Sequence, residues 1–180
     1  MKKEIKQEIT IPEGIKINLE NKQLEIEGPL GKIKKQINLG KIPLRIENNK
    51  IIIFYKNSTK KEKKIIKTQS AHIKNMIKGV QHKFEYKLKI CFNHFPFTVR
   101  IEENKAIIKN FIGEKKERMI ELPKGASVKV DKDIIIVSSI DKEIAGQAAA
   151  NLERITRIKG RDIRIFQDGI YIINKNGKEI

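Results

Sequence analysis

One cysteine and three histidines are the side chains best suited to catalysis or metal binding. Cys91 and His94 are the nearest pair of a nucleophile and a base. On an extended strand, residues three apart point to opposite faces, so these two side chains meet only if the chain turns. His72 and His82 are too scattered for a metal-ligand motif. The spacing therefore favours a small, half-buried thiol at Cys91 over a catalytic one.

The motifs that carry phosphate, zinc, dinucleotide or acyl-transfer chemistry are missing from the chain. The two carboxylates of Glu102-Glu103 are not placed to act together in catalysis, because neighbouring strand residues face opposite ways. We therefore expect no enzyme and no cofactor. An enzyme that uses Cys91 remains the alternative, and it would lose its activity in Cys91→Ala.

Basic residues near the C-terminus are more informative. Arg154 and Arg157 share a face if they are helical. The planar fork of arginine grips phosphate oxygens with two hydrogen bonds. The other reading is helix-dipole complementation, with a salt bridge from Arg161 or Arg164 to Asp162 or Asp168. We favour RNA contact for the whole group, Arg154, Arg157, Lys159, Arg161 and Arg164.

A second basic cluster crowds the first turn of a predicted helix. Cations are unfavourable at a helix N-terminus, and a polyanion would relieve that cost. A solvated loop leading into the helix is an open alternative. These residues, with one lysine near the C-terminus, complete the candidate RNA-binding set: Lys60, Lys61, Lys63, Lys64 and Lys175.

The composition points to a polyanionic partner. There are 39 Lys+Arg against 22 Asp+Glu, a net charge of +17 that is spread along the chain. Such a charge repels itself unless a polyanion neutralises it. Membrane-surface binding is the weaker alternative, because Ser70 and several alanines interrupt the apolar helix stripes. With one cysteine, no signal peptide and no long apolar run, we expect a cytoplasmic protein.

The elements that position these residues recur along the chain. Turns at Asn21-Lys22 and Asn104-Lys105 are offset by 83 residues, and so are the isoleucine runs that begin at Ile51 and Ile134. The matched offsets predict that two strand pairs repeat, and a duplication is the favoured origin. Each half reads as antiparallel strands, one helix and a closing strand.

Two helices are expected from capping signals and apolar spacing. Thr59 and Glu62 have the spacing of a capping box, and Gly79 is the expected end of the first helix. Asp141 is the expected N-cap of the second helix, which Gly160 should end. Their apolar stripes are Ile66, Ser70, Ile73 and Ile77 in the first, and Ile144, Ala148, Leu152 and Ile155 in the second.

A closing strand is expected after each helix. Phe84, Tyr86, Leu88, Ile90 and Phe92 alternate with polar residues. The second closing strand should carry a more ragged alternation, in Ile163, Ile165, Ile170 and Ile172.

The predicted fold class is α+β, with two tandem copies of a small domain, each an antiparallel sheet with one helix packed on one face. The boundary is expected near Asn93–Pro96. The predicted domains are residues 1–92 and residues 93–180, the second being the main rRNA-binding half.

Several segments, in order along nearly the whole chain, resemble one known family. The most specific runs from Gln147-Ala148-Ala149-Ala150 through Arg157-Ile158-Lys159-Gly160-Arg161-Asp162 to Phe166-Gln167-Asp168-Gly169-Ile170-Tyr171. The others are Ile11-Pro12-Glu13-Gly14, Gly28-Pro29-Leu30-Gly31, Phe84-Glu85-Tyr86-Lys87-Leu88, His94-Phe95-Pro96 and Asn110-Phe111-Ile112-Gly113-Glu114-Lys115. Together they are similar to the large-subunit ribosomal protein L-six family, in its archaeal and eukaryotic branch.

The resemblance implies two duplicated α+β domains that bind large-subunit rRNA directly. It implies a place at the base of the lateral stalk, near the translation-factor-binding site and neighbouring ribosomal proteins. Carried over, it puts the RNA contacts on the Arg154–Arg164 stretch. The expected function is therefore that of a structural constituent of the large ribosomal subunit. The alternative is a basic architectural protein that binds nucleic acid outside the ribosome, with comparable affinity for duplex DNA.

Overall fold

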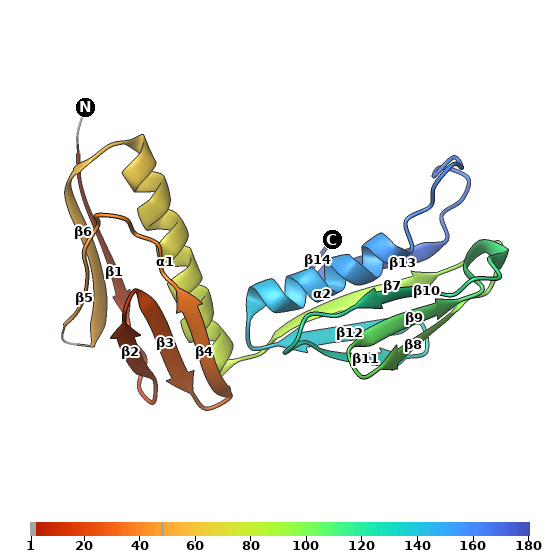
Figure 1. The fold of residues 1–180 in the computed structure, drawn as a ribbon, viewed down its shortest axis with the longest axis horizontal. Helices are drawn as coiled ribbons and strands as arrows, with labels where there is room; N and C mark the ends of the chain where they lie inside the picture. The colour runs from red at the N-terminus through yellow and green to blue at the C-terminus, as the bar shows by residue number, and fades with distance from the viewer. Residues whose placement is uncertain (1–2, 48) are drawn as a thin grey trace. The chain divides into compact units, whose positions relative to one another are not determined.

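The computed structural model describes residues 3–47 and 49–180, and it divides the chain into two compact units, Met1–Lys83 and Phe84–Ile180. The first unit contains β1 (Lys3–Thr10), β2 (Lys16–Glu20), β3 (Gln23–Gly28), β4 (Gly31–Gln36), β5 (Leu44–Glu47), β6 (Lys50–Ser58) and α1 (Lys60–Gln81). Two antiparallel sheets form, β1-β6-β5 and β2-β3-β4. Helix α1 packs against strands of both sheets (Figure 1). The core between them is almost entirely isoleucine and leucine, including Leu24, Ile26, Ile51, Ile53, Ile66 and Ile73.

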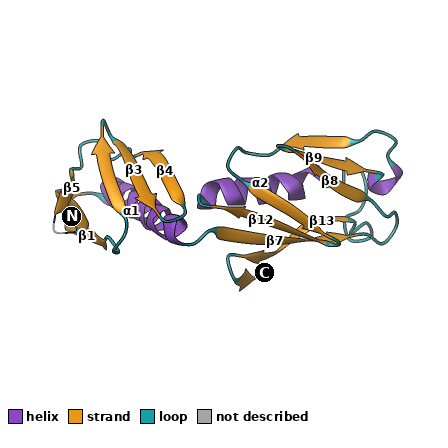
Figure 2. Ribbon diagram, turned by 90° about the horizontal axis from the view of Figure 1, so that it is seen from below, coloured by secondary structure: helices purple, strands orange, loops and turns teal. Residues whose placement is uncertain are grey.

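The second unit repeats this plan and adds to it. It contains β7 (Phe84–Cys91), β8 (Thr98–Glu102), β9 (Lys105–Lys109), a short 3-10 turn (Phe111–Gly113), β10 (Arg118–Glu121), β11 (Ser127–Asp131), β12 (Ile134–Ser139), α2 (Lys142–Ile155), β13 (Gly169–Lys175) and β14 (Lys178–Glu179). Its sheets are β10-β9-β8 and β11-β12-β7-β13-β14. Figure 2 shows α2 beside the strands β12, β7 and β13, which it contacts along with β10.

The predicted α+β class with two tandem copies is confirmed, and each copy divides its strands between two sheets. The sheet β2-β3-β4 of the first unit corresponds to β8-β9-β10 of the second, and the strand pair β5-β6 corresponds to β11-β12. The counterpart of β1 is β7, because each pairs antiparallel with the strand that precedes its helix, β6 or β12.

The predicted boundary between residues 92 and 93 therefore differs from the structure, which divides the chain after Lys83. The alternating strand Phe84–Cys91 does not close the first sheet. It lies in the middle of the second sheet, with β12 on one side and β13 on the other. Leu88 of this strand is completely buried in the core of the second unit, together with Ala148 and Leu152 of α2. The first unit has no described strand after its helix.

The predicted helix starts are confirmed and the predicted ends are wrong. Thr59 and Glu62 form the reciprocal capping box, and the Asp141 carboxylate accepts a hydrogen bond from the backbone of Glu143. Helix α1 runs through Gly79 to Gln81, because that glycine is buried against the core and Val80 after it is fully buried. Helix α2 ends at Ile155, five residues before Gly160.

Candidate nucleic-acid interface

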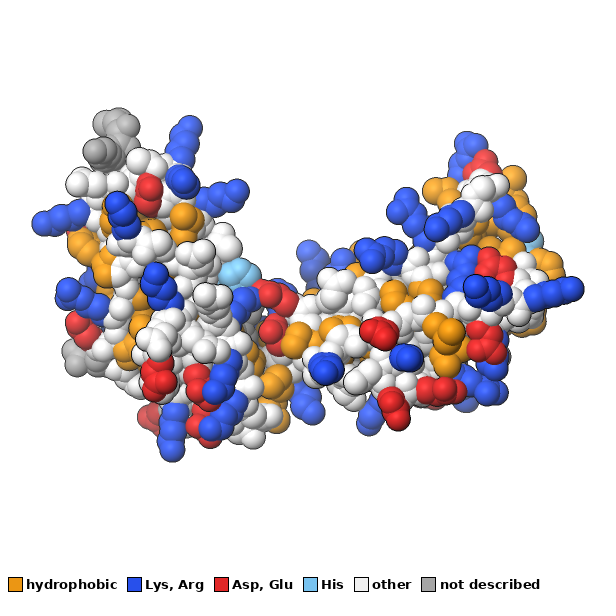
Figure 3. Space-filling model, in the orientation of Figure 1, with side chains coloured by type: hydrophobic (Ala, Val, Ile, Leu, Met, Phe, Trp, Pro, Cys, Tyr) orange, Lys and Arg blue, Asp and Glu red, His pale blue; other side chains and the backbone are white. Residues whose placement is uncertain are grey.

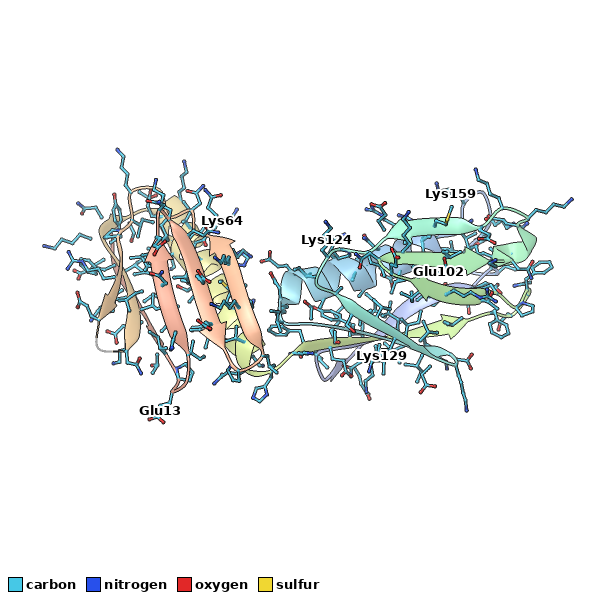
Figure 4. The ribbon with its side chains drawn as sticks, turned by 60° about the horizontal axis from the view of Figure 1, so that its bottom comes forward. Glu13, Lys64, Glu102, Lys124, Lys129 and Lys159 are labelled. Atoms are coloured by element: carbon cyan, nitrogen blue, oxygen red, sulfur yellow. The ribbon has the colours of Figure 1, made fainter. Side chains whose placement is uncertain are left out.

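The candidate site is built around the 156–168 loop, the segment between α2 and β13 that projects from the second unit in Figure 1. This loop carries four of the five basic residues of the Arg154–Arg164 group that was predicted to bind RNA, and Arg154 lies in the last turn of α2 just before it. All five are exposed: Arg154, Arg157, Lys159, Arg161 and Arg164. Figure 3 shows basic side chains on the projecting loop, beside apolar and acidic ones, and Figure 4 labels Lys159. Ile163 and Ile165, predicted to be in a strand, lie in this loop and are 70% and 64% exposed.

The residue that follows the end of α2, Thr156, contacts the start of β13. The Thr156 hydroxyl turns back to donate a hydrogen bond to the Glu153 carbonyl at 3.0 Å, and it accepts one from the backbone N–H of Ile170 at 2.9 Å. This buried hydroxyl ties the end of α2 to the start of β13. The backbone N–H of Arg157 still bonds to the Arg154 carbonyl at 3.2 Å, so the two arginines stay one turn apart although Arg157 is not helical.

Arg118, in β10, holds the start of the loop. Its Nη1 donates to the Ile155 carbonyl at 2.7 Å and its Nε donates to the Glu114 carboxylate at 2.8 Å. Its guanidinium also lies over the Phe111 ring, with 4.4 Å between the guanidinium carbon and the ring centroid. The hydrogen bond and ion pair with Arg118 lower the pKa of Glu114, although burial opposes them. Arg118 thus ties the end of α2 to the smaller sheet.

Asp168 holds the other end of the loop. Its carboxylate is only 1% exposed and accepts hydrogen bonds from the backbone N–H groups of Asn93 at 2.7 Å and His94 at 3.0 Å. The second oxygen lies 2.7 Å from His94 Nδ1. Burial by itself would raise the pKa of Asp168, but the hydrogen bonds from His94 and Asn93 outweigh it and lower the pKa to about 2. Because the carboxylate is ionised and can only accept, His94 Nδ1 carries the proton.

Stacked rings connect the Asp168–His94 pair to the basic residues of the loop. The Phe166 ring stacks on His94, with 4.6 Å between centroids and 27° between planes. The Arg161 guanidinium also lies over the Phe166 ring, with 4.6 Å between the guanidinium carbon and the ring centroid. A cation held over a ring keeps its charge and its donors at the surface. Arg161 is therefore oriented by a chain of contacts that begins at the buried Asp168.

A groove of about 1050 Å³ runs between the C-terminal end of α2, the 156–168 loop and the start of β13. Its walls mix apolar and basic side chains. The residues that line it include Cys91, Arg154, Thr156, Arg157, Ile163, Phe166, Ile170 and Tyr171.

The structure does not bring all predicted residues to this place. Lys175 lies at the far end of β13, six residues from Gly169, or about 20 Å along a strand. Arg164 is 87% exposed but pairs with Asp162, Nη2 to Oδ2 at 2.9 Å, as the alternative reading of that segment expected. The cluster in the first unit lies on the first turn of α1, in a helix rather than in a solvated loop, and all four members are exposed: Lys60, Lys61, Lys63 and Lys64.

Sequence reasoning missed the residues that hold the loop. Arg118 was not singled out, and Asp168 was considered as a salt-bridge partner of Arg161 or Arg164. His94 was considered as a base for Cys91, yet its Nδ1 is bonded to Asp168. Only one signal existed: both His94 and Asp168 lie inside segments that carried the family resemblance. Their pairing across 74 residues left no local trace.

Among residues 3–47 and 49–180, no group of three or more His, Cys, Asp or Glu side chains could hold a metal ion. Cys91 is free and partly buried. In the same described part of the chain, no helix is long and apolar enough to span a bilayer.

Comparison with known proteins identifies one family. The family model described as Ribosomal protein L6 matches residues 11–83 and again residues 95–169. The chain is 44% identical to the large ribosomal subunit protein uL6 of Nanoarchaeum equitans, over 98% of this chain and 96% of that one. It is 41% identical to the protein of the same name from Methanococcus vannielii, over 97% and 96% of the two chains. For Methanothrix thermoacetophila the identity is 37%, over 97% and 99%.

Proposed function

Because the chain belongs to the ribosomal protein L6 family, and is therefore a structural constituent of the large ribosomal subunit rather than an enzyme, we propose that its second unit binds rRNA directly through the 156–168 loop and the end of α2. The site on the ribosome is the base of the stalk, near the place where translation factors bind. Neighbouring ribosomal proteins are its other partners there. The cytoplasmic ribosome is its location.

One observation carries the proposal: an exposed loop with five basic residues in or beside it is held rigidly from both ends. Arg118 and Asp168 are the anchors. A preorganised loop loses little conformational freedom when it binds, so more of the electrostatic gain remains as affinity. Lysine and arginine side chains that neutralise phosphates release condensed counterions, which is the main source of sequence-independent affinity.

Recognition by this surface should depend on RNA shape. The deep, narrow major groove of an A-form helix hides base edges from side chains, while its phosphates and 2′-hydroxyl groups remain accessible. The first unit supplies a second basic surface, the first turn of α1, whose lysines would contact rRNA more weakly and without arginine forks.

Crosslinking tests the proposal directly. Large subunits assembled with this chain are irradiated, and the crosslinked peptides and rRNA nucleotides are identified. We expect peptides from residues 154–168 joined to rRNA of the stalk base. Crosslinks confined to the first unit, or to rRNA remote from the factor-binding site, would contradict it. Equal affinity for duplex DNA and for the crosslinked rRNA segment would favour the architectural alternative instead.

A further inference from the structure

The groove beside the 156–168 loop is larger than a loop anchor requires. Its volume of about 1050 Å³ is comparable with pockets that hold drug-sized ligands, which span roughly 300–1,000 Å³. One wall is the end of α2, with Arg154, and the other is the loop, with Arg157 and Ile163. Ile170 and Tyr171 from β13 form part of the lining.

An aromatic face is available in this groove. The Tyr171 ring packs over Gly169, where an added Cβ would lie 3.3 Å from the ring atoms, yet the residue remains 42% exposed. Ile163 is 70% exposed on the loop. Exposed apolar side chains that line one concave surface mark a binding site more often than isolated ones do.

The positive charges around the groove favour a ligand that carries negative charge. Arg154 and Arg157 line it against one carboxylate, Glu153, and Lys159 and Arg161 follow on the same loop. An apolar protein segment would cover the guanidinium groups without pairing them, which is costly. A nucleotide offers both complements, a flat base for the apolar wall and a phosphate for the arginines.

The groove is also preformed. The Thr156 hydroxyl fixes β13 through the Ile170 N–H, and Arg118 fixes the Ile155 carbonyl where the loop departs. We infer that this groove binds one unpaired nucleotide of the rRNA, with its base against Tyr171 and Ile163 and its phosphates against Arg154 and Arg157. The inference rests on the proposed function and goes beyond it, because phosphate contacts along the loop require no unpaired base.

Cys91 provides a probe, since it lines the groove and is the sole cysteine of the chain. The full-length protein is alkylated with iodoacetamide alone, with a transcript of the large-subunit rRNA, and with a fully paired RNA duplex. If the occupied groove blocks alkylation, the remaining rate is proportional to the unbound fraction of the protein, so the reaction slows roughly 100-fold at a transcript concentration of about 100 times Kd. The duplex should bind the basic loop but leave the alkylation rate unchanged.

The outcomes separate this inference from the proposed function. A transcript that binds tightly without slowing alkylation overturns the groove as a nucleotide site and leaves direct rRNA binding intact. A transcript that does not bind overturns the proposed function itself. Equal protection by the duplex, or protection that appears only in assembled subunits, overturns the inference, the latter by assigning the groove to a protein partner.

Variants of Tyr171 give an independent measure. Stacking of a base on an aromatic ring implies that Tyr171→Ala weakens transcript binding by roughly 5- to 150-fold. Tyr171→Phe keeps the ring and should bind as the unsubstituted chain does. Tyr55→Ala, which removes a partly buried tyrosine from the first unit, is the matched control. Equal losses in Tyr171→Phe and Tyr171→Ala, or no loss in either, would contradict a stacked base.

Discussion

The Nδ1 atom of His94 lies 2.7 Å from Oδ2 of the buried Asp168, and this contact joins two loops that are 74 residues apart. The backbone N–H groups of Asn93 and His94 converge on the other carboxylate oxygen. The 156–168 loop is thereby attached to the turn that follows β7, so the stability of the unit and the position of its basic residues share one anchor.

The first prediction concerns Asp168→Asn. Loss of the charge weakens three hydrogen bonds to a buried group, so the free energy of unfolding should fall by about 1–3 kcal/mol at neutral pH. Denaturant unfolding followed by circular dichroism measures this change. An unchanged free energy of unfolding would mean that the His94 contact contributes nothing to the fold.

The same pair predicts a pH dependence. The folded pKa of about 2 lies below the ordinary value of 3.8. The carboxylate therefore stabilises the fold above pH 3.8, and that contribution, about 2 kcal/mol, is lost as pH falls toward 2. Comparison with Asp168→Asn isolates the effect, since Glu114, Asp162 and the other carboxylates titrate in both proteins. The stability difference between the two proteins should shrink between pH 4 and pH 2, and a constant difference would contradict the assignment.

The second prediction concerns the triple substitution of Arg157, Lys159 and Arg161 by Ala. All three side chains are exposed, so the fold should be retained. Affinity for the rRNA transcript should fall, and the slope of log affinity against log salt should flatten by roughly 0.7–0.9 for each phosphate contact removed. Filter binding over a range of salt concentrations measures both.

The matched control for that experiment removes three exposed lysines of the same unit that lie on or near β11: Lys124, Lys129 and Lys132. Figure 4 labels Lys124, Lys129 and Lys159. Equal losses in the two triple variants would show that only overall charge matters and that the loop has no special part in binding.

The third prediction concerns Arg118→Lys. A lysine keeps the charge but cannot hold Glu114 and the Ile155 carbonyl with a planar fork. We expect faster amide hydrogen exchange across residues 156–168 and weaker rRNA binding, with a loss of about 1–3 kcal/mol in unfolding free energy. Arg100→Lys, at an exposed position on β8, should change none of these. Unaltered exchange in the loop would remove Arg118 as its anchor.

The fourth prediction concerns Gly28, in the first unit. An added Cβ would lie 2.7 Å from Val80 Cγ2 and 3.1 Å from the Val80 carbonyl oxygen, where α1 packs on β3. Gly28→Ala should therefore destabilise the first unit by about 1–3 kcal/mol. For Gly146→Ala, in α2, the added Cβ would lie 3.4 Å from the Tyr86 hydroxyl oxygen and 3.8 Å from its ring carbon Cζ, so this change should be neutral or stabilising, because alanine favours helix. A Gly28→Ala protein as stable as the parent would show that the helix can shift.

Local patterns in the sequence were sufficient for much of the fold. The capping box at Thr59 and the N-cap at Asp141 depend on residues two or three apart, so their signals are complete within a short window. The alternation from Phe84 to Ile90 reports one buried face of a strand for the same reason. The duplicated plan was visible as the 83-residue offset between matching turns and isoleucine runs. The net charge indicated a polyanionic partner.

Partners distant in the chain decided the rest. Alternation cannot say which sheet a strand joins, and Phe84–Cys91 entered the second sheet because β12 and β13 both pair with it. The Thr156 hydroxyl, at the C-terminal end of helix α2, bonds to the backbone of Ile170, fourteen residues later, and no local pattern showed this. The sequence by itself determined the basic groups, the amphipathic helices and the repeated strand pairs. Only the tertiary structure determined which basic residues the buried Asp168 and the fork of Arg118 hold in place. The reason is that hydrogen bonds between remote segments exist only after the core has brought those segments together.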